Sequence, residues 1–75
     1  MKITLETGPW AAGYVKERSL VLDMPEGSTV FDVIATAKIP VAEAGIAVIN
    51  GKVVPKKQAL SDGTTMKIHS IIIGG

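Results

Sequence analysis

The sequence predicts an α+β domain of ββαββ order, with four strands and one helix laid across one face of their sheet. Three observations predict it. Apolar and polar residues alternate in two short segments near the start. Apolar residues recur at helical spacing once in the middle, and alternation returns in the second half around two glycine-containing turns. Because a helix buries its apolar stripe only against another element, one helix and one sheet should share a single core.

The first two strands are expected to form a hairpin with a long connection. Ile3 and Leu5 alternate with polar neighbours, and residues 19–24 alternate in the same way. Residues 8–13 contain two glycines and a proline, which are typical of a loop. Pro25-Glu26-Gly27 is expected to end the second strand.

The middle segment predicts the helix. Thr29 lies three residues before Asp32, which suits a helix N-cap followed by an acid in the first turn. Four apolar residues follow the i, i+3, i+4, i+7 spacing of one helix face: Val30, Val33, Ile34 and Ala37. Pro40 is expected to stop the helix, since proline disfavours helical geometry at the residue before it. The segment is rich in β-branched residues, so a strand over residues 30–34 is the alternative.

The second half predicts a short hairpin and a final strand. Residues 45–49 are expected to form a short apolar strand that leads into Asn50-Gly51, the strongest short hairpin signal in the chain, and residues 52–54 a brief return strand. Asp62-Gly63 marks another turn, in which a positive φ is expected at the glycine, as at Gly51. Alternation in the last strand separates two faces, with Met66, Ile68 and Ile72 on one and Lys67, His69, Ile71 and Ile73 on the other.

Size and composition limit the classes of function. With 75 residues, 47% of them hydrophobic, the chain is expected to be one domain over residues 1–75. No apolar run approaches the roughly 18 residues of a membrane span, and the first residues lack a signal-peptide core, so a cytoplasmic protein is expected. A net charge of +1 and single Trp, Tyr and Phe residues argue against nucleic acid as a partner. The absence of cysteine excludes a disulfide, a cysteine-bound metal and a thiol nucleophile.

The last two residues, Gly74-Gly75, are the candidate functional feature. Two glycines put no side chain beside the terminal carboxylate, so a flexible tail over about residues 73–75 could enter a channel too narrow for other residues. An ionised carboxylate is a poor electrophile, but an activating enzyme could convert it to an acyl-adenylate. A frayed end or an added remnant is the alternative interpretation.

Several segments together resemble one family. They are residues 29–34 at the helix start, residues 48–55 in the second hairpin, residues 60–63 before the last strand, and Gly74-Gly75. In this order they resemble the prokaryotic sulfur carriers of the ThiS and MoaD type, which have the ubiquitin-like β-grasp fold. The resemblance implies one helix packed on a mixed four-stranded sheet. The long first loop is more similar to MoaD and the second hairpin to ThiS, so the thiamine and molybdopterin pathways both stay open.

The resemblance implies a chemical role for Gly75. In such carriers an E1-like adenylating enzyme of the ThiF or MoeB type uses ATP to adenylate the terminal glycine. A persulfide or sulfide then displaces AMP and leaves a thiocarboxylate, which a thiazole synthase or the large subunit of molybdopterin synthase accepts as sulfur donor. By this resemblance the chain is a carrier or a small synthase subunit rather than an enzyme. It would have no catalytic residues, no metal and no bound cofactor.

Ile71 and Ile73 are the next candidates. Alternation places them opposite Met66 and Ile68, where they would either form an exposed apolar rim that binds a partner beside Gly74, or pack as ordinary core residues. His69 is expected to face solvent on the same strand. Two further functions stay open: a ubiquitin-like modifier that is conjugated to other proteins through Gly75, and a β-grasp interaction domain with an inert tail.

Overall fold

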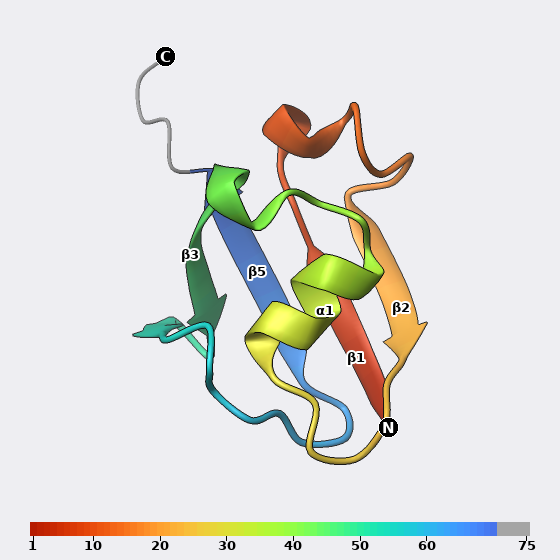
Figure 1. The fold of residues 1–75 in the computed structure, drawn as a ribbon, viewed down its shortest axis with the longest axis vertical. Coiled ribbons are helices and arrows are strands. Elements are labelled where there is room, and N and C mark those ends of the chain that lie inside the picture. The colour runs from red at the N-terminus through yellow and green to blue at the C-terminus, as the bar shows by residue number, and fades with distance from the viewer. Residues whose placement is uncertain (71–75) are drawn as a thin grey trace.

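One helix lies across one face of a five-stranded sheet in the computed structural model, which describes residues 1–70 of the chain (Figure 1). The strands are β1 (Lys2–Glu6), β2 (Ser19–Asp23), β3 (Ala44–Ile49), β4 (Lys52–Val54) and β5 (Thr65–Ser70), and the helix is α1 (Val30–Thr36). Two short 3₁₀ helices, η1 (Pro9–Ala11) and η2 (Val41–Glu43), lie in the loops, where the sequence predicted no helix.

The sheet is mixed, with the strand order β2-β1-β5-β3-β4. Strand β5 pairs parallel with β1 and antiparallel with β3, whereas both hairpin pairs, β1 with β2 and β3 with β4, are antiparallel. The sheet therefore has five strands and not four, because residues 52–54 form a ladder of their own with β3. The last strand within residues 1–70, β5, is at the centre of the sheet.

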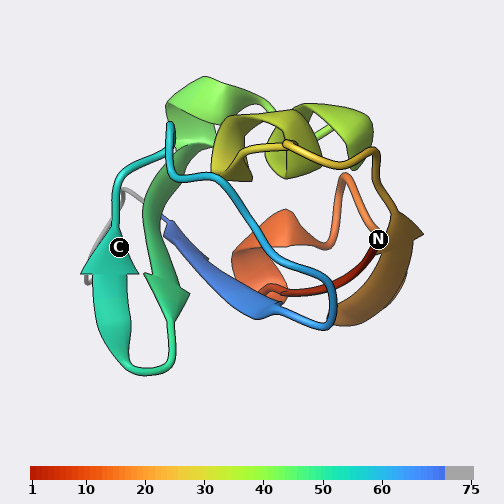
Figure 2. The same ribbon diagram turned by 90° about the horizontal axis from the view of Figure 1, so that it is seen from below.

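Helix α1 covers one face of the sheet, as Figure 2 shows from below. The buried core residues come from α1 and from the strands beneath it. The largest fully buried side chains come from one face each of β1, α1 and β5: Ile3, Leu5, Val30, Val33, Ile34, Met66 and Ile68. The predicted helix face, and the predicted inward faces of β1 and β5, are thus confirmed. Burial of these aliphatic side chains contributes about 1.5–3 kcal/mol each to stability.

The helix begins where the sequence predicts and ends sooner. Thr29 accepts a hydrogen bond from the Asp32 amide at 3.3 Å, and the Asp32 carboxylate accepts one from the Thr29 amide at 2.9 Å, which is a capping box. The helix ends at Thr36 and not at the residue before Pro40, because Lys38 adopts a left-handed conformation with a φ of 62°. With seven residues, α1 depends on its packing for stability.

The turn predictions are confirmed. Asn50 and Gly51 both have a positive φ, of 53° and 76°, as a two-residue turn that matches the twist of its strands requires. Gly63 has a φ of 84°. No helix within residues 1–70 is long and apolar enough to cross a membrane.

Candidate functional site

The four residues predicted to act at the C-terminus lie outside the described residues. Gly75, the expected site of modification, Gly74, and the two rim candidates Ile73 and Ile71 all follow Ser70, the last residue of β5. Their placement, like the tail at residues 73–75, stays a prediction. What the structure describes is the part of the domain from which these residues continue.

Strand β5 is paired with β1 on one side over its first half and with β3 on the other side up to its end. Its first half pairs with β1, and Ser70 at its end pairs with Ala44 at the start of β3. The register of β3 shifts between Ala44 and Ile46, and there Lys56 donates a hydrogen bond to the Gly45 carbonyl at 3.1 Å. The residues after Ser70 therefore continue from the centre of the sheet, which is a rigid base for a reactive segment.

Two loops lie at the same end of the molecule as the end of β5 (Figure 1). One is the long first loop with η1, and the other contains η2, which leads directly into β3. The Tyr14 hydroxyl of the first loop donates a hydrogen bond to a Glu43 carboxylate oxygen of η2. This hydrogen bond, followed by desolvation and by the Glu43 charge, raises the pKa of Tyr14 above its ordinary value of 10.0.

A pocket separates the first loop from the last part of β5. It has a volume of about 260 Å³, and its lining residues are Thr7, Gly8, Pro9, Trp10, Lys67, Ile68 and His69. The Trp10 ring packs partly against the core, and a Cβ on Gly8 would lie only 3.2 Å from that ring. The loop is therefore folded back on the core. The volume is below the roughly 300–1,000 Å³ of common small-molecule sites.

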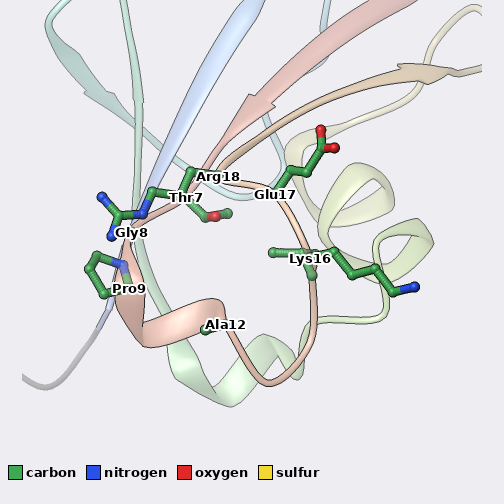
Figure 3. A pocket seen from close by; sticks show the side chains of 8 residues that line it. Thr7, Gly8, Pro9, Ala12, Lys16, Glu17 and Arg18 are labelled. Carbon is green, nitrogen blue, oxygen red and sulfur yellow. The ribbon is translucent and has the colours of Figure 1, made fainter.

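A second pocket lies inside the first loop itself, as Figure 3 shows, with Gly8 and Pro9 on one side and Lys16 on the other. Its volume is about 140 Å³, which again is small for a ligand site. The Thr7 hydroxyl is buried at this point with no hydrogen-bond partner among the described residues. The pocket thus contains one unsatisfied polar atom but no set of groups that identifies a ligand.

The sheet face opposite α1 is not covered by any element of residues 1–70, and it carries apolar residues beside the end of β5. Ile46 is 38% exposed and Val53 is 70% exposed, and Val48 lies directly opposite Val53 in the ladder. We call these three residues the outer patch. Lys67 and His69 of β5 lie opposite Val48 and Ile46, so both border it. His69 is exposed, as predicted.

The outer patch lies in the basic half of the chain. From residue 38 onward the chain has five lysines and two acids, whereas residues 1–37 have three basic and five acidic residues. The lysines are Lys38, Lys52, Lys56, Lys57 and Lys67. At the patch itself both signs are present, because Glu6 of β1 lies opposite Lys67 and shares a pocket with Lys67 and Val48. An exposed apolar patch with a charged border is typical of a contact with another protein.

Within residues 1–70, no group of three or more histidine, aspartate and glutamate residues is arranged to hold a metal ion. The outer patch and the Tyr14–Glu43 contact were missed by sequence reasoning. Both join residues from different elements, and Tyr14 and Glu43 are 29 positions apart. Only the alternation of residues 66–70, which places His69 outward, gave a signal for the patch.

Comparisons with known proteins give structural neighbours only. No family model and no curated protein matches the sequence. Two solved structures of small archaeal modifier protein 1 (SAMP1) from Haloferax volcanii match with a TM-score of 0.75, at 16% and 15% identity. They cover 100% and 91% of this chain, which in turn covers 100% and 94% of theirs.

A third neighbour is a Pyrococcus furiosus protein provisionally assigned as molybdopterin converting factor subunit 1. It matches with a TM-score of 0.76 at 17% identity, over 96% of this chain and 99% of its own. At such low identity the likeness shows the fold alone, which is the small α+β β-grasp fold. These neighbours fit the predicted resemblance to ubiquitin-like proteins of the ThiS and MoaD type.

Proposed function

We propose that this chain is a sulfur carrier whose Gly75 carboxylate is activated by an E1-like enzyme and converted to a thiocarboxylate. One observation carries the proposal: a chain that ends its sequence in Gly-Gly shares its fold, over nearly its whole length, with SAMP1 and with an assigned molybdopterin converting factor subunit. Fold alone does not specify function, so the diglycine is the necessary second element.

The proposed chemistry uses no catalytic group of this chain. A carboxylate oxygen of Gly75 attacks the α-phosphorus of ATP in the partner's active site, and pyrophosphate leaves. Sulfide then attacks the acyl carbon, AMP leaves, and a thiocarboxylate remains. A persulfide donor would give an acyl disulfide first, which a thiol reduces to the thiocarboxylate. ATP belongs to the activating enzyme, and in this proposal the carrier itself binds no cofactor or metal.

The described residues would serve recognition. The outer patch gives the activating enzyme an apolar surface beside the end of β5, and the central position of that strand fixes where the tail starts. The acceptor would be a synthase that takes sulfur for thiamine thiazole or molybdopterin, as the molybdopterin assignment of one neighbour supports. Such a carrier would work in the cytoplasm.

A second candidate function is supported by the two SAMP1 neighbours, which are named as modifier proteins. In that function the same activated Gly75 forms an amide with a lysine of another protein. Both functions need the adenylate, and they differ only in the nucleophile that displaces AMP.

Intact-mass spectrometry separates these functions. The chain is incubated with its native activating enzyme, ATP and sulfide, and a variant that lacks Gly75 is the matched control. We expect a mass increase equal to the replacement of one oxygen by one sulfur, located at Gly75 and absent from the control. Conjugates that survive denaturation would favour the modifier instead. An unchanged mass under all conditions would contradict both functions and leave an interaction domain.

A further inference from the structure

The two edges of the sheet differ in how well they are protected. Strand β4 has only three residues and begins with a lysine. It does not reach the start of β3, where the Lys56 side chain donates a hydrogen bond to the Gly45 carbonyl. Short length and lysines are the usual devices that stop edge strands from pairing with other chains. Strand β2 has five residues with the sequence Ser-Leu-Val-Leu-Asp, and it contains no lysine, no proline and no bulge.

The backbone of β2 presents regular hydrogen-bonding groups on its free side. In its ladder with β1, the Thr7 amide donates to the Arg18 carbonyl at 2.7 Å and the Met24 amide donates to the Met1 carbonyl at 2.8 Å. Hydrogen-bonded and non-hydrogen-bonded pairs alternate along an antiparallel ladder. The backbone N–H and C=O groups of the even-numbered residues of β2 therefore point towards β1. The amides and carbonyls of Ser19, Val21 and Asp23 therefore point away from the sheet. No hydrogen bond within residues 1–70 reaches them.

These three residues define a self-complementary register. If two copies of β2 pair antiparallel around a two-fold axis, one residue lies opposite its own counterpart, in either a hydrogen-bonded or a non-hydrogen-bonded pair. An axis at Leu20 or Leu22 would pair only three of the five strand residues of each copy with one another. Val21 on the axis uses the whole strand and places Ser19 of each copy opposite Asp23 of the other. An axis at Asp23 would place two carboxylates face to face, which is unfavourable. An axis at Ser19 would use residues that precede the strand.

We propose that β2 pairs with β2 of a second copy around a two-fold axis at Val21, so that two sheets join edge to edge. Each hydrogen-bonded pair exchanges two N–H···O bonds. Val21, which is 66% exposed, lies against its own counterpart on the outer face, and the half-buried Leu20 and Leu22 oppose each other on the helix face. The Asp23 carboxylate keeps its ion pair with Lys2 at 2.8 Å on the side of β1. On the side of the second copy, it lies beside the hydroxyl of the Ser19 of that copy.

The dimer does not depend on the proposed function. Strand β1 separates β2 from β5, and in Figure 1 β2 lies on the other side of the sheet from β3. Strand β3 carries Ile46 and Val48 of the outer patch. Both copies thus keep the outer patch and the end of β5 accessible. Because only one strand of each copy is in contact, the interface is small and the dimer weak.

Analytical ultracentrifugation of the full chain tests this. We expect the mass to rise from one chain to two as the concentration approaches about 1 mM, the range of weak interfaces. Val21→Lys, which puts two like charges side by side on the axis, should abolish the rise. Val53→Lys is the matched control, since Val53 is an equally exposed valine on the other edge strand, and it should dimerise as the wild type does. Equal melting temperatures would show that both variants fold.

A wild type that stays at one chain mass to that concentration overturns the proposal. A Val21→Lys variant that still dimerises also overturns it and places the contact elsewhere, the outer patch included.

A cross-linking experiment locates the axis. The chain has no cysteine, so Val21→Cys introduces a single thiol. Bonded residues of an antiparallel pair have Cα atoms about 5.5 Å apart, within the roughly 4.4–6.8 Å that a disulfide spans. Mild oxidation should cross-link Val21→Cys at least tenfold faster than Val53→Cys. Equal rates for the two variants would contradict a two-fold axis at Val21.

Discussion

The two faces of the sheet differ in what they contribute. The face under α1 is closed, with Ile3, Leu5 and Met66 fully buried, and it accounts for the cohesion of the domain. The opposite face is open and carries the outer patch among charged side chains. Because successive strand residues point to opposite faces, one step along a strand moves a side chain from a structural role to a surface one. The difference can be tested one residue at a time.

The largest effect is expected from Ala47→Asp. Ala47 is 1% exposed and lies opposite Ile68 under the helix, so the new carboxylate would be buried without a partner. We expect a loss of about 3–5 kcal/mol in the free energy of unfolding. That is a large part of the total stability of so small a domain. Urea denaturation followed by Trp10 fluorescence measures it. A loss below about 1 kcal/mol would contradict the packing described for this face.

The neighbouring change, Ile46→Asp, should have a different result. Ile46 is in the outer patch opposite His69, where a carboxylate stays solvated. We expect the melting temperature to change by only a few degrees, while kcat/KM of the activating enzyme for this chain falls by about tenfold, the loss of one apolar contact at an interface. Val21→Asp on β2 is the control and should leave kcat/KM unchanged. Equal kcat/KM values for Ile46→Asp and wild type would remove the outer patch from the proposed docking surface.

A smaller effect is expected from the contact between the two loops at the end of β5. The raised pKa of Tyr14 means that the folded state holds the phenol proton more tightly than the unfolded chain. The contribution to stability is therefore complete below pH 10 and is lost as the pH rises through the pKa of the folded state. Tyr14 is the only tyrosine, so ultraviolet titration of the phenolate reports it directly. In Glu43→Gln the titration should move towards lower pH; an unchanged curve would mean that Glu43 does not hold this hydroxyl.

The smallest effect concerns Asp23 on the outer face. A hydrogen bond from Lys2, together with its charge, lowers the pKa of Asp23 below its ordinary value of 3.8. The contribution to stability is therefore present above pH 3.8 and is lost as the pH falls through the pKa of the folded state. Both side chains are exposed, so the gain is slight. Carboxyl titration by NMR should show a higher pKa for Asp23 in Lys2→Met than in wild type. Identical titrations would show that the pair does not persist in solution.

Sequence reasoning succeeded where the signal is local. Thr29 and Asp32 form a capping box within four residues, and Asn50-Gly51 makes its turn from its own backbone preferences. It failed where a segment depends on distant partners. The helix ends at a left-handed Lys38 that no local rule predicted. The expected count of four strands was one too low, because the predicted return strand over residues 52–54 joins the same sheet beside β3. The loop containing η1 takes its conformation from Trp10 against the core and from Tyr14 against Glu43.

The sequence by itself determined which residues face inward, because the periods of strand and helix are fixed by backbone geometry. It also determined the turns and the helix cap, since these are made by residues a few positions apart. Only the tertiary structure decided that β5 lies in the centre of the sheet, parallel to β1, and that Ile46, Val48 and Val53 meet Lys67 and His69 on one face. Pairing between strands some sixty residues apart depends on the closure of the whole core, and no local preference encodes it.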